Sequence, residues 1–404
     1  MVSRPVLTGL CRSLETAPNF SNFVQNGRIV RGRGIAMKLL AQAGFVLFLV
    51  LGLDACVQTA RSAEMPWIKV SGDKKGFVTD SGKRFVPWGV NYDHDDRGRL
   101  LEDYWVDEWP MVEQHFAAIR DLKCNVVRIH LQFGKFMKGP SEPDRQAHEN
   151  LSRLLALAER TNLYLDLTGL GCYHKQDVPG WYDDLDEAER WEAQAVFWKS
   201  VAETCKGSPA VFCYDLMNEP VSPGGRSKAR DWLGPAFAGK HFVQRISLDQ
   251  RDRPRPEIAV AWLKRLNRAI RDVDTRHLIT VGLVDWSLDR PGLTSGFVPS
   301  VVVEHVDFLC VHLYPEAGKL KEAQQTLAGF AVGKPVVIEE TFPLKCSSEE
   351  LAEFFVQTKG TAAGWISFYW GKPIEELKKS RELGDAILLQ WLLKYERLSE
   401  FMLP

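Results

Sequence analysis

Two glutamates stand in sequence contexts that suit acid–base chemistry. Glu219 lies in the segment YDLMNEP, and Glu340 ends the segment KPVVIEE much further along the chain. Two carboxyl groups facing one another across a cleft are what cleavage of a glycosidic bond requires, because one protonates the leaving oxygen and the other attacks or stabilises the anomeric carbon. Their mutual repulsion raises one pKa and keeps the acid protonated near neutral pH. For one glutamate alone a helix cap or surface ion pair is the better interpretation. For the two glutamates together, in these contexts, catalysis is the better interpretation.

The segments that must position these acids alternate between apolar runs and helical patterns. A short hairpin is predicted first, at 67–70 and 77–79. Eight runs rich in Val, Ile, Leu or Phe follow, as expected for parallel strands buried on both faces. They are 85–91, 125–131, 164–168, 211–218, 278–282, 308–313, 335–340 and 365–370. Helical patterns cover 111–122, 151–158, 193–204, 258–273, 322–327, 349–358 and 386–395, with a short fifth helix near 301–305.

Eight strand–helix pairs over about 330 residues predict a closed (β/α)8 TIM barrel, a single-domain α/β fold. A doubly wound open sheet is the alternative, but no glycine-rich fingerprint follows the first strand. The longest irregular stretch, 221–257, follows the fourth strand, and loops of that length are usually functional. In a barrel the catalytic groups lie at the carboxyl ends of the strands, where the fourth and seventh strands face each other. These ends supply Asn91, Arg128 to His130, Thr168, Asn218, Glu219, His312 to Tyr314, Glu339, Glu340 and Trp370.

Five of these strand ends resemble glycoside hydrolase family five, the cellulase and mannanase family of clan A. The resemblance rests on VRIH at 127–130, NEP at 218–220, HLY at 312–314, KPVVIEE at 334–340 and Trp370. It spans about residues 67–396. The tripeptide NEP alone is common, whereas the ordered set at five strand ends is specific. The resemblance implies a retaining hydrolase of β-linked glucans or mannans.

The resemblance also implies a role for each matched residue. Glu219 would be the general acid/base, and Glu340 the nucleophile that forms a glycosyl-enzyme. The family's nucleophile lies six positions after the lysine of Lys-Pro, which selects Glu340 over Glu339, and alternation along a strand predicts that only one of the two points inward. The expected substrate-binding residues are Asn218 toward the sugar 2-hydroxyl, Arg128 and Tyr314 as orienters of the nucleophile, His312 beside the acid, and Trp370 under the sugar. Structural roles are the alternatives for three of them: a barrel ion pair for Arg128, a core position for His312 and a barrel plug for Trp370.

Several positions depart from the family's pattern or are left with two interpretations. Many members carry a histidine just past the third strand, where this chain reads LTG, and an aromatic residue then glycine after the nucleophile, where it reads TFP. These departures leave the subfamily and substrate open. Further candidate sugar contacts, each weighed equally against packing or loop solvation, are Trp181, Tyr182, Trp232, Asp93, His94 and Asp95.

The N-terminal region differs in character from the rest. Residues 1–36 carry five Arg and one Glu, and Met37-Lys38 is followed by an apolar run to Leu53. This layout is typical of a secretory signal and is short for a membrane span. We therefore predict an unstructured upstream extension at 1–36, a signal peptide at 37–63 and the catalytic barrel at 64–404. An N-terminal anchor or arm is the alternative for 1–36. Export would make the protein secreted or periplasmic, with a lipid anchor at Cys56 as an alternative.

Composition narrows the function further. The 51 basic and 52 acidic residues give a net charge of −1, which argues against general nucleic-acid binding. Export would permit disulfides, yet Cys124, Cys213 and Cys310 lie in apolar runs and are expected to be small buried hydrophobes. Neither CxxC nor HExxH occurs, which gives a metal site weak support.

The prediction is a retaining β-glycosidase that needs no cofactor and acts on a β-linked polysaccharide or oligosaccharide. It implies no nucleic acid and no stable protein partner. A non-catalytic glycan-binding barrel and a transglycosylase using the same residues are the alternatives. Glucan or mannan, and endo or exo action, stay open.

Overall fold

The computed structural model describes residues 65–404 apart from 223–230 and 289–293. The extension predicted at 1–36 and the signal peptide predicted at 37–63 lie outside these residues. Ala63–Pro404 forms one compact unit. Within the described part of the chain, no helix has the length and apolar character needed to cross a bilayer.

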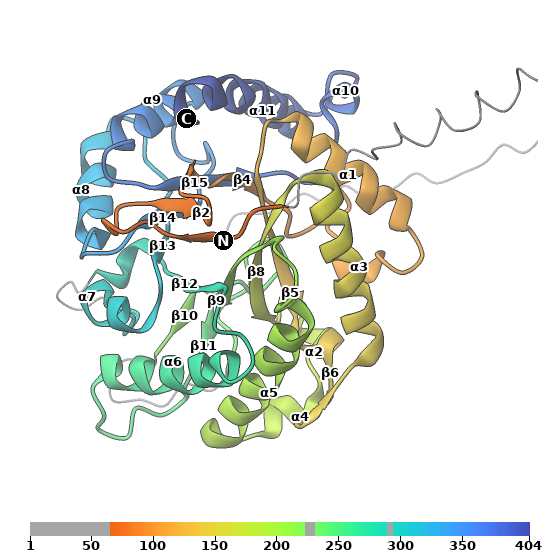
Figure 1. The fold of residues 1–404 in the computed structure, drawn as a ribbon, viewed down its shortest axis with the longest axis vertical. Helices are drawn as coiled ribbons and strands as arrows, with labels where there is room; N and C mark the ends of the chain where they lie inside the picture. The colour runs from red at the N-terminus through yellow and green to blue at the C-terminus, as the bar shows by residue number, and fades with distance from the viewer. Residues whose placement is uncertain (1–64, 223–230, 289–293) are drawn as a thin grey trace, which may run out of the picture. The chain divides into compact units, whose positions relative to one another are not determined.

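Eight parallel strands form the central sheet, in the order β12-β9-β8-β5-β4-β15-β14-β13 (Figure 1). The strands are β4 (Trp88–Asn91), β5 (Val126–Gln132), β8 (Tyr164–Gly171), β9 (Val211–Asn218), β12 (Leu278–Gly282), β13 (Leu309–His312), β14 (Val336–Glu340) and β15 (Gly364–Phe368). The two end strands meet where the backbone N–H of His312 donates to the carbonyl of Leu283 at 2.7 Å and Val284 bridges to His312. The sheet is therefore a nearly closed barrel, as predicted.

Helices surround this sheet on its outer face (Figure 1). They are α1 (Trp109–Asp121), α2 (Phe133–Phe136), α3 (Arg145–Thr161), α4 (Gly180–Asp184), α5 (Glu187–Cys205), α6 (Arg255–Arg271), α7 (Pro299–Val302), α8 (Leu320–Phe330), α9 (Ser348–Thr358), α10 (Ile374–Leu377) and α11 (Leu383–Met402). Several begin earlier than their apolar stripes predict, because polar caps extend them. Asp186, for example, accepts from the backbone of Glu189 at the start of α5, which satisfies a free N–H of the first turn.

Short strands lie outside the barrel. They are β1 (Ile68–Val70), β2 (Phe77–Thr79), β3 (Arg84–Phe85), β6 (Met137–Gly139), β7 (Glu142–Pro143), β10 (Pro220–Val221) and β11 (Gln244–Arg245). The β1–β2 hairpin confirms the predicted start of the fold. The single strand predicted at 85–91 is wrong in one respect, since Phe85 belongs to β3 and the barrel strand begins at Trp88. Pro87 lies between them, and a residue without an N–H interrupts a ladder of backbone hydrogen bonds.

Close packing of the first two barrel strands brings site residues together. A Cβ on Gly89 would lie 2.3 Å from the carbonyl oxygen of Val126, so only glycine permits this approach. The Tyr395 hydroxyl from α11 donates to the Gly89 carbonyl at 2.6 Å, and its ring stacks on Trp88 at 4.1 Å. In the same register that pairs Gly89 with Val126, Asn91 pairs with Arg128 at the strand ends. The core thus fixes two polar side chains at the barrel mouth.

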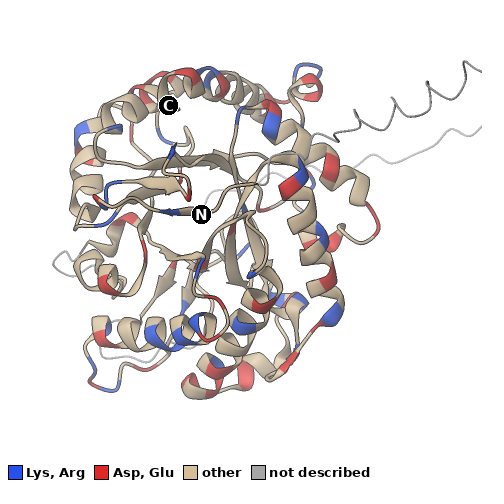
Figure 2. Ribbon diagram, in the orientation of Figure 1, with Lys and Arg blue, Asp and Glu red and all other residues tan. Residues whose placement is uncertain are grey.

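The outer helices carry mixed charge. Lys and Arg are interspersed with Asp and Glu along the helices seen in Figure 2. Such a surface lacks the single-sign field that draws proteins to phosphate backbones.

Candidate active site

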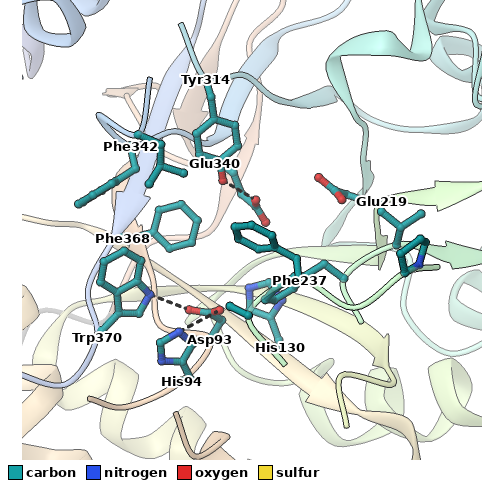
Figure 3. A pocket seen from close by; sticks show the side chains of 15 residues that line it. Asp93, His94, His130, Glu219, Phe237, Tyr314, Glu340, Phe342, Phe368 and Trp370 are labelled. Atoms are coloured by element: carbon teal, nitrogen blue, oxygen red, sulfur yellow. Dashed lines mark hydrogen bonds and ion pairs between the residues drawn. The ribbon is translucent and has the colours of Figure 1, made fainter. Parts of the chain in front are cut away.

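A cavity of about 400 Å³ opens at the carboxyl ends of the barrel strands. Both glutamates singled out in the sequence line it, as do Tyr314 and Trp370 (Figure 3). Its remaining lining residues are Asp93, His94, His130, Pro235, Phe237, Ala238, Phe242, Val243, Phe342, Leu344 and Phe368. The cavity therefore combines a small set of titratable groups with extensive apolar surface.

Glu340 is held by two donors at the end of β14. The Arg128 guanidinium donates through Nη1 to Oε1 at 2.6 Å, and the Tyr314 hydroxyl donates to Oε2 at 2.9 Å. Hydrogen bonds to both oxygens fix the orientation of the carboxyl group. Glu340 is thus held in one orientation at the cavity floor, in contact with the two residues that the family resemblance named.

Glu219 follows β9 in a strained backbone conformation. Its φ is +47°, a left-handed value that residues with a Cβ rarely adopt. The backbone N–H of Glu219 donates to the Gly282 carbonyl at 3.1 Å, which ties this turn to the neighbouring strand. Its carboxylate is 2.9 Å from His312 Nδ1, and His312 Nδ1 is 3.4 Å from a carboxylate oxygen of Glu340. The turn therefore aims Glu219 across the mouth toward Glu340.

Arg128 is fully buried and links the floor of the site. Its Nη1 donates to the Asn91 side chain at 2.9 Å, and its Nη2 donates to Asn218 at 3.0 Å and to Asp215 at 2.7 Å. Asn218 in turn donates through Nδ2 to the Phe242 carbonyl at 3.0 Å. The structure places Arg128 and Asn218 beside Glu340 and Glu219, as predicted, and Arg128 also makes the barrel ion pair given as its structural alternative.

Both adjacent glutamates of β14 face the barrel centre. Glu339 Oε2 lies 3.3 Å from His312 Nε2 and 3.5 Å from Arg128, while Glu340 contacts the same arginine. The prediction that alternation lets only one point inward is wrong, because the β13–β14 register shifts at this position. A bulge places two consecutive side chains on one side. Only Glu340 lines the cavity.

A buried acidic layer lies beneath the cavity floor. Carboxylate oxygens of Asp166, Asp215 and Glu339 lie within 4.8 Å of one another, close enough to share one cation. Arg128 supplies positive charge to this layer through Asp215 and Glu339. Burial raises the pKa of Asp166 well above its usual range, and the neighbouring Glu339 charge raises it further. Burial also raises the pKa of Asp215, to about 6, whereas Arg128 and His312 overcome burial and lower the pKa of Glu339 to about 2.

His312 carries the positive charge between the two cavity acids. Burial alone would lower its pKa, but Glu340, Glu219 and Glu339 together raise that pKa to about 10. The ordinary unfolded value is about 6.5. The stabilisation from this proton is therefore complete below pH 6.5 and is lost as the pH rises toward 10.

We expect the free energy of unfolding to fall between pH 7 and pH 10 with a contribution from His312 of up to about 1.4 kcal/mol per pH unit. His312→Gln should flatten this part of the profile. Urea-unfolding midpoints of the wild type and of His312→Gln, measured from pH 7 to pH 10, give the part of the pH dependence of stability that is due to His312. Parallel profiles for the two proteins would contradict the assignment.

Trp370 lies at the opposite end of the cavity from Glu219 (Figure 3). Its indole N–H donates to Asp93 at 3.2 Å, and its ring is parallel to His94 with centroids 5.8 Å apart. His130 also lines the cavity and is hydrogen-bonded to the Tyr173 hydroxyl. These groups form a polar, flat-sided recess beside the acids. Of the three loop residues predicted as hydroxyl contacts, Asp93 and His94 line the cavity, while Asp95 is buried against Arg99 at 2.8 Å.

The other candidate sugar platforms lie in packing positions away from the described cavity. Tyr182 is fully buried and Trp232 nearly so, and the Arg190 guanidinium is sandwiched between their rings at 3.5 and 4.4 Å. Trp181 packs against Phe133 with ring centroids 5.8 Å apart. The packing interpretation therefore holds for these three aromatics. Cys124, Cys213 and Cys310 are buried free thiols, as expected.

The apolar wall of the cavity went unpredicted. It comes from residues 235–243, inside the long irregular stretch after β9, and includes Phe237 and Phe242. The only sequence signal for this wall was the length of the loop, because its residues show neither helical nor strand periodicity.

Comparison with known proteins places the chain in a family. The model named Cellulase (glycosyl hydrolase family 5) matches residues 81–358. A mannan endo-1,4-β-mannosidase A from Emericella nidulans is 25% identical over 191 residues, which covers 44% of this chain and 42% of that protein. One from Aspergillus aculeatus is 23% identical over 199 residues, covering 43% and 45%. The chain thus matches less than half the length of these relatives.

Solved structures share the fold at low sequence identity. The exo-β-1,4-mannosidase Op5Man5 from Opitutaceae bacterium strain TAV5 superposes with a TM-score of 0.60 at 16% identity, covering 83% of this chain and 63% of that one. The endo-1,4-β-mannanase from Eisenia fetida gives a TM-score of 0.55 at 15% identity, covering 82% and 95%. The family model spans well over half of the sequence and includes both site glutamates. The chain belongs to glycosyl hydrolase family 5.

Proposed function

We propose that this protein is a retaining β-glycosidase, with Glu219 as acid/base and Glu340 as nucleophile. The observation that carries the proposal is the closeness of the pair, since one carboxylate oxygen of Glu219 lies within 4.8 Å of one carboxylate oxygen of Glu340. Retaining enzymes separate their carboxyl groups by about 5–5.5 Å, whereas inverting enzymes leave about 6.5–9.5 Å for a water molecule. A gap this small favours direct attack by a carboxylate.

The first step uses the two acids on opposite sides of the scissile bond. Glu340 Oε attacks the anomeric carbon while Glu219 gives its proton to the leaving oxygen. Arg128 and Tyr314 hold the Glu340 carboxyl group in place, so the attack needs little reorganisation. In the second step Glu219 takes a proton from water, which attacks the glycosyl-enzyme and releases Glu340.

The surrounding groups suit the sugar at the cleavage point. The Asn218 side chain is held by Arg128 and by the Phe242 carbonyl. Asn218 directly precedes Glu219, where its side chain can contact the sugar 2-hydroxyl. Trp370 offers a flat face on the recess bounded by Asp93 and His94, and aromatic faces suit the apolar side of a pyranose ring. His312 lies between the two acids, with its Nδ1 2.9 Å from Glu219 and 3.4 Å from Glu340. No step of this reaction needs a cofactor.

The substrate we propose is a β-linked manno- or gluco-configured glycan. Relatives named as mannan endo-1,4-β-mannosidases favour the manno configuration. We also keep the proposed organisation, with an upstream extension at 1–36, a signal at 37–63 that exports the protein, and the barrel at 64–404.

Reducing-sugar release from soluble β-mannans, β-glucans and short β-oligosaccharides tests the proposal. We expect release on one sugar class, absent in Glu340→Ala. Product analysis by mass then separates hydrolysis from transglycosylation, because transfer yields longer oligosaccharides. Binding of these glycans by a folded protein that releases no sugar would contradict the proposal and favour a glycan-binding barrel.

A further inference from the structure

The cavity is divided into a polar end and an apolar end. Side chains able to hydrogen-bond sugar hydroxyls gather around the two acids, Trp370 and His130 (Figure 3). The hairpin after β9 adds a wall made of carbon, from Pro235, Phe237, Ala238, Phe242 and Val243. Further apolar surface comes from Phe342 and Phe368, which pack against Trp370, and from Leu344. The polar groups around the acids are those that a sugar ring at the cleavage point would contact. A second ring against the apolar wall would leave its hydroxyls without side-chain partners, which costs free energy wherever water is excluded.

This apolar wall lies on the side of the acid. The Asn218 side chain donates to the Phe242 carbonyl at 3.0 Å, and the N–H of Gln244, next to Val243, donates to the Glu219 carbonyl at 3.4 Å. The wall is therefore attached directly to the residue that protonates the leaving oxygen. Whatever is bonded to that oxygen must lie against it.

The wall is a fixed feature of the loop. Residues 234–243 form a hairpin, in which the Gly234 N–H donates to the Val243 carbonyl at 2.8 Å and Phe237 and Lys240 exchange backbone hydrogen bonds at 2.8 and 3.0 Å. Ala238 and Gly239, with φ of +48° and +80°, form its tight turn. His241 N–H donates to the Tyr173 carbonyl at 2.9 Å, which ties the hairpin to the barrel.

Two large apolar side chains of this cavity are exposed. Phe237 at the hairpin tip is 71% exposed and Leu344 is 61% exposed, both on the cavity lining. An ordered turn that holds a phenyl ring toward a site and leaves it in water is stabilised when an apolar group covers it. Aliphatic residues such as Leu344 and Val243 also lack the flat faces that stack on sugars.

We propose that the leaving-group side of this site takes an apolar aglycone, so that among the β-mannosides and β-glucosides of the proposed function the enzyme prefers one sugar joined to an alkyl or aryl group over a chain of sugars. The inference rests on the proposed glycosidase function. In the reaction the bond between the anomeric carbon and the aglycone oxygen breaks, and Glu219 donates the proton that makes the apolar alcohol. Water then supplies the hydroxyl that replaces it on the sugar.

Alkyl glycosides of one sugar test this inference without changing the leaving-group chemistry. We expect kcat/KM on hexyl β-mannoside or β-glucoside to exceed that on the methyl glycoside at least tenfold, with the concentration kept below that of micelle formation. It should also exceed that on the matching disaccharide. A benzyl glycoside, whose leaving alcohol is nearly as weak an acid as hexanol, compared with the hexyl glycoside tells whether the wall prefers a ring or a chain, and either preference supports the inference.

Phe237→Ser should reduce the hexyl-to-methyl ratio at least threefold. Phe401→Ser is the matched control, because Phe401 in α11 is 67% exposed and lies outside the cavity lining; it should leave the ratio unchanged. Hydrolysis of oligosaccharides with no preference for hexyl over methyl would overturn the inference and leave the glycosidase function intact. An equal fall of the ratio in both variants would also overturn it. No hydrolysis of any glycoside would overturn both proposals.

Discussion

Glu340→Ala is expected to lower kcat on unactivated β-glycosides by roughly four to six orders of magnitude, the scale seen when a catalytic unit loses its nucleophile. The structure gives the reason: Glu340 is the carboxylate that Arg128 and Tyr314 aim into the cavity, at 2.6 and 2.9 Å. Its removal leaves those two donors facing a small space. A small anion such as azide should enter this space and attack from the face that Glu340 used.

The configuration of the rescued product separates the two acids. With an activated aryl β-glycoside, azide in place of Glu340 should give the α-glycosyl azide by a single inversion. Glu219→Ala keeps the nucleophile, so azide should intercept the glycosyl-enzyme and give the β-glycosyl azide. Proton NMR of the anomeric hydrogen measures both. A β product from Glu340→Ala, or hydrolysis near the wild-type rate, would overturn the assignment of roles.

The barrel strands were predictable because each is an apolar run buried on both faces. The predicted strands 211–218 and 278–282 coincide with β9 and β12, since nothing but apolar burial defines them. Arg128, Asn218, His312 and Tyr314 were predictable as a group for a second reason. Once eight strands close in order, the residues at their carboxyl ends must meet at one mouth.

Other features depend on contacts that no local pattern encodes. The register shift that turns both Glu339 and Glu340 inward arises between β13 and β14, so alternation within one strand cannot reveal it. The hairpin at 234–243 is held by a hydrogen bond to the Tyr173 carbonyl, and the residue that follows it bonds to the Glu219 carbonyl. Both acceptors belong to segments distant in sequence. Tyr182 and Trp232 enclose Arg190, and this contact also joins segments distant in sequence. The sequence alone therefore assigned equal weight to sugar contact and to packing for these two aromatic residues.

In the acidic layer under the site, replacing an aspartate by asparagine should change the free energy of unfolding in opposite directions at Asp215 and at Asp166. Asp215→Asn should lower the free energy of unfolding by about 3 kcal/mol, the lower end of the cost of breaking a buried ion pair, because the burial that raises the pKa of Asp215 to about 6 offsets part of that cost once the charge is removed. Its Oδ2 accepts from Arg128 and from Thr168, both at 2.7 Å, and its Oδ1 accepts from the Gly282 N–H at 2.7 Å. An amide can replace only part of that acceptor capacity. Arg128 would also lose an anchor that keeps it beside Glu340, so kcat should fall too.

Asp166→Asn, on the neighbouring strand, should instead raise the free energy of unfolding at pH 7.5, and by more than at pH 5. Both carboxyl oxygens of Asp166 are buried and accept no N–H or O–H hydrogen bond among the described residues, and its pKa is raised by burial, by the Glu339 charge and by a hydrogen bond to Glu339 that needs its proton. A raised pKa means that folding takes up a proton, so the wild-type protein loses stability as the pH climbs above the unfolded value of about 3.9. An asparagine is neutral at every pH and avoids that loss. Urea-unfolding midpoints at pH 5 and pH 7.5 should therefore show the variant gaining on the wild type as the pH rises. Equal losses in Asp166→Asn and Asp215→Asn would show instead that the three acids act as one indivisible cluster.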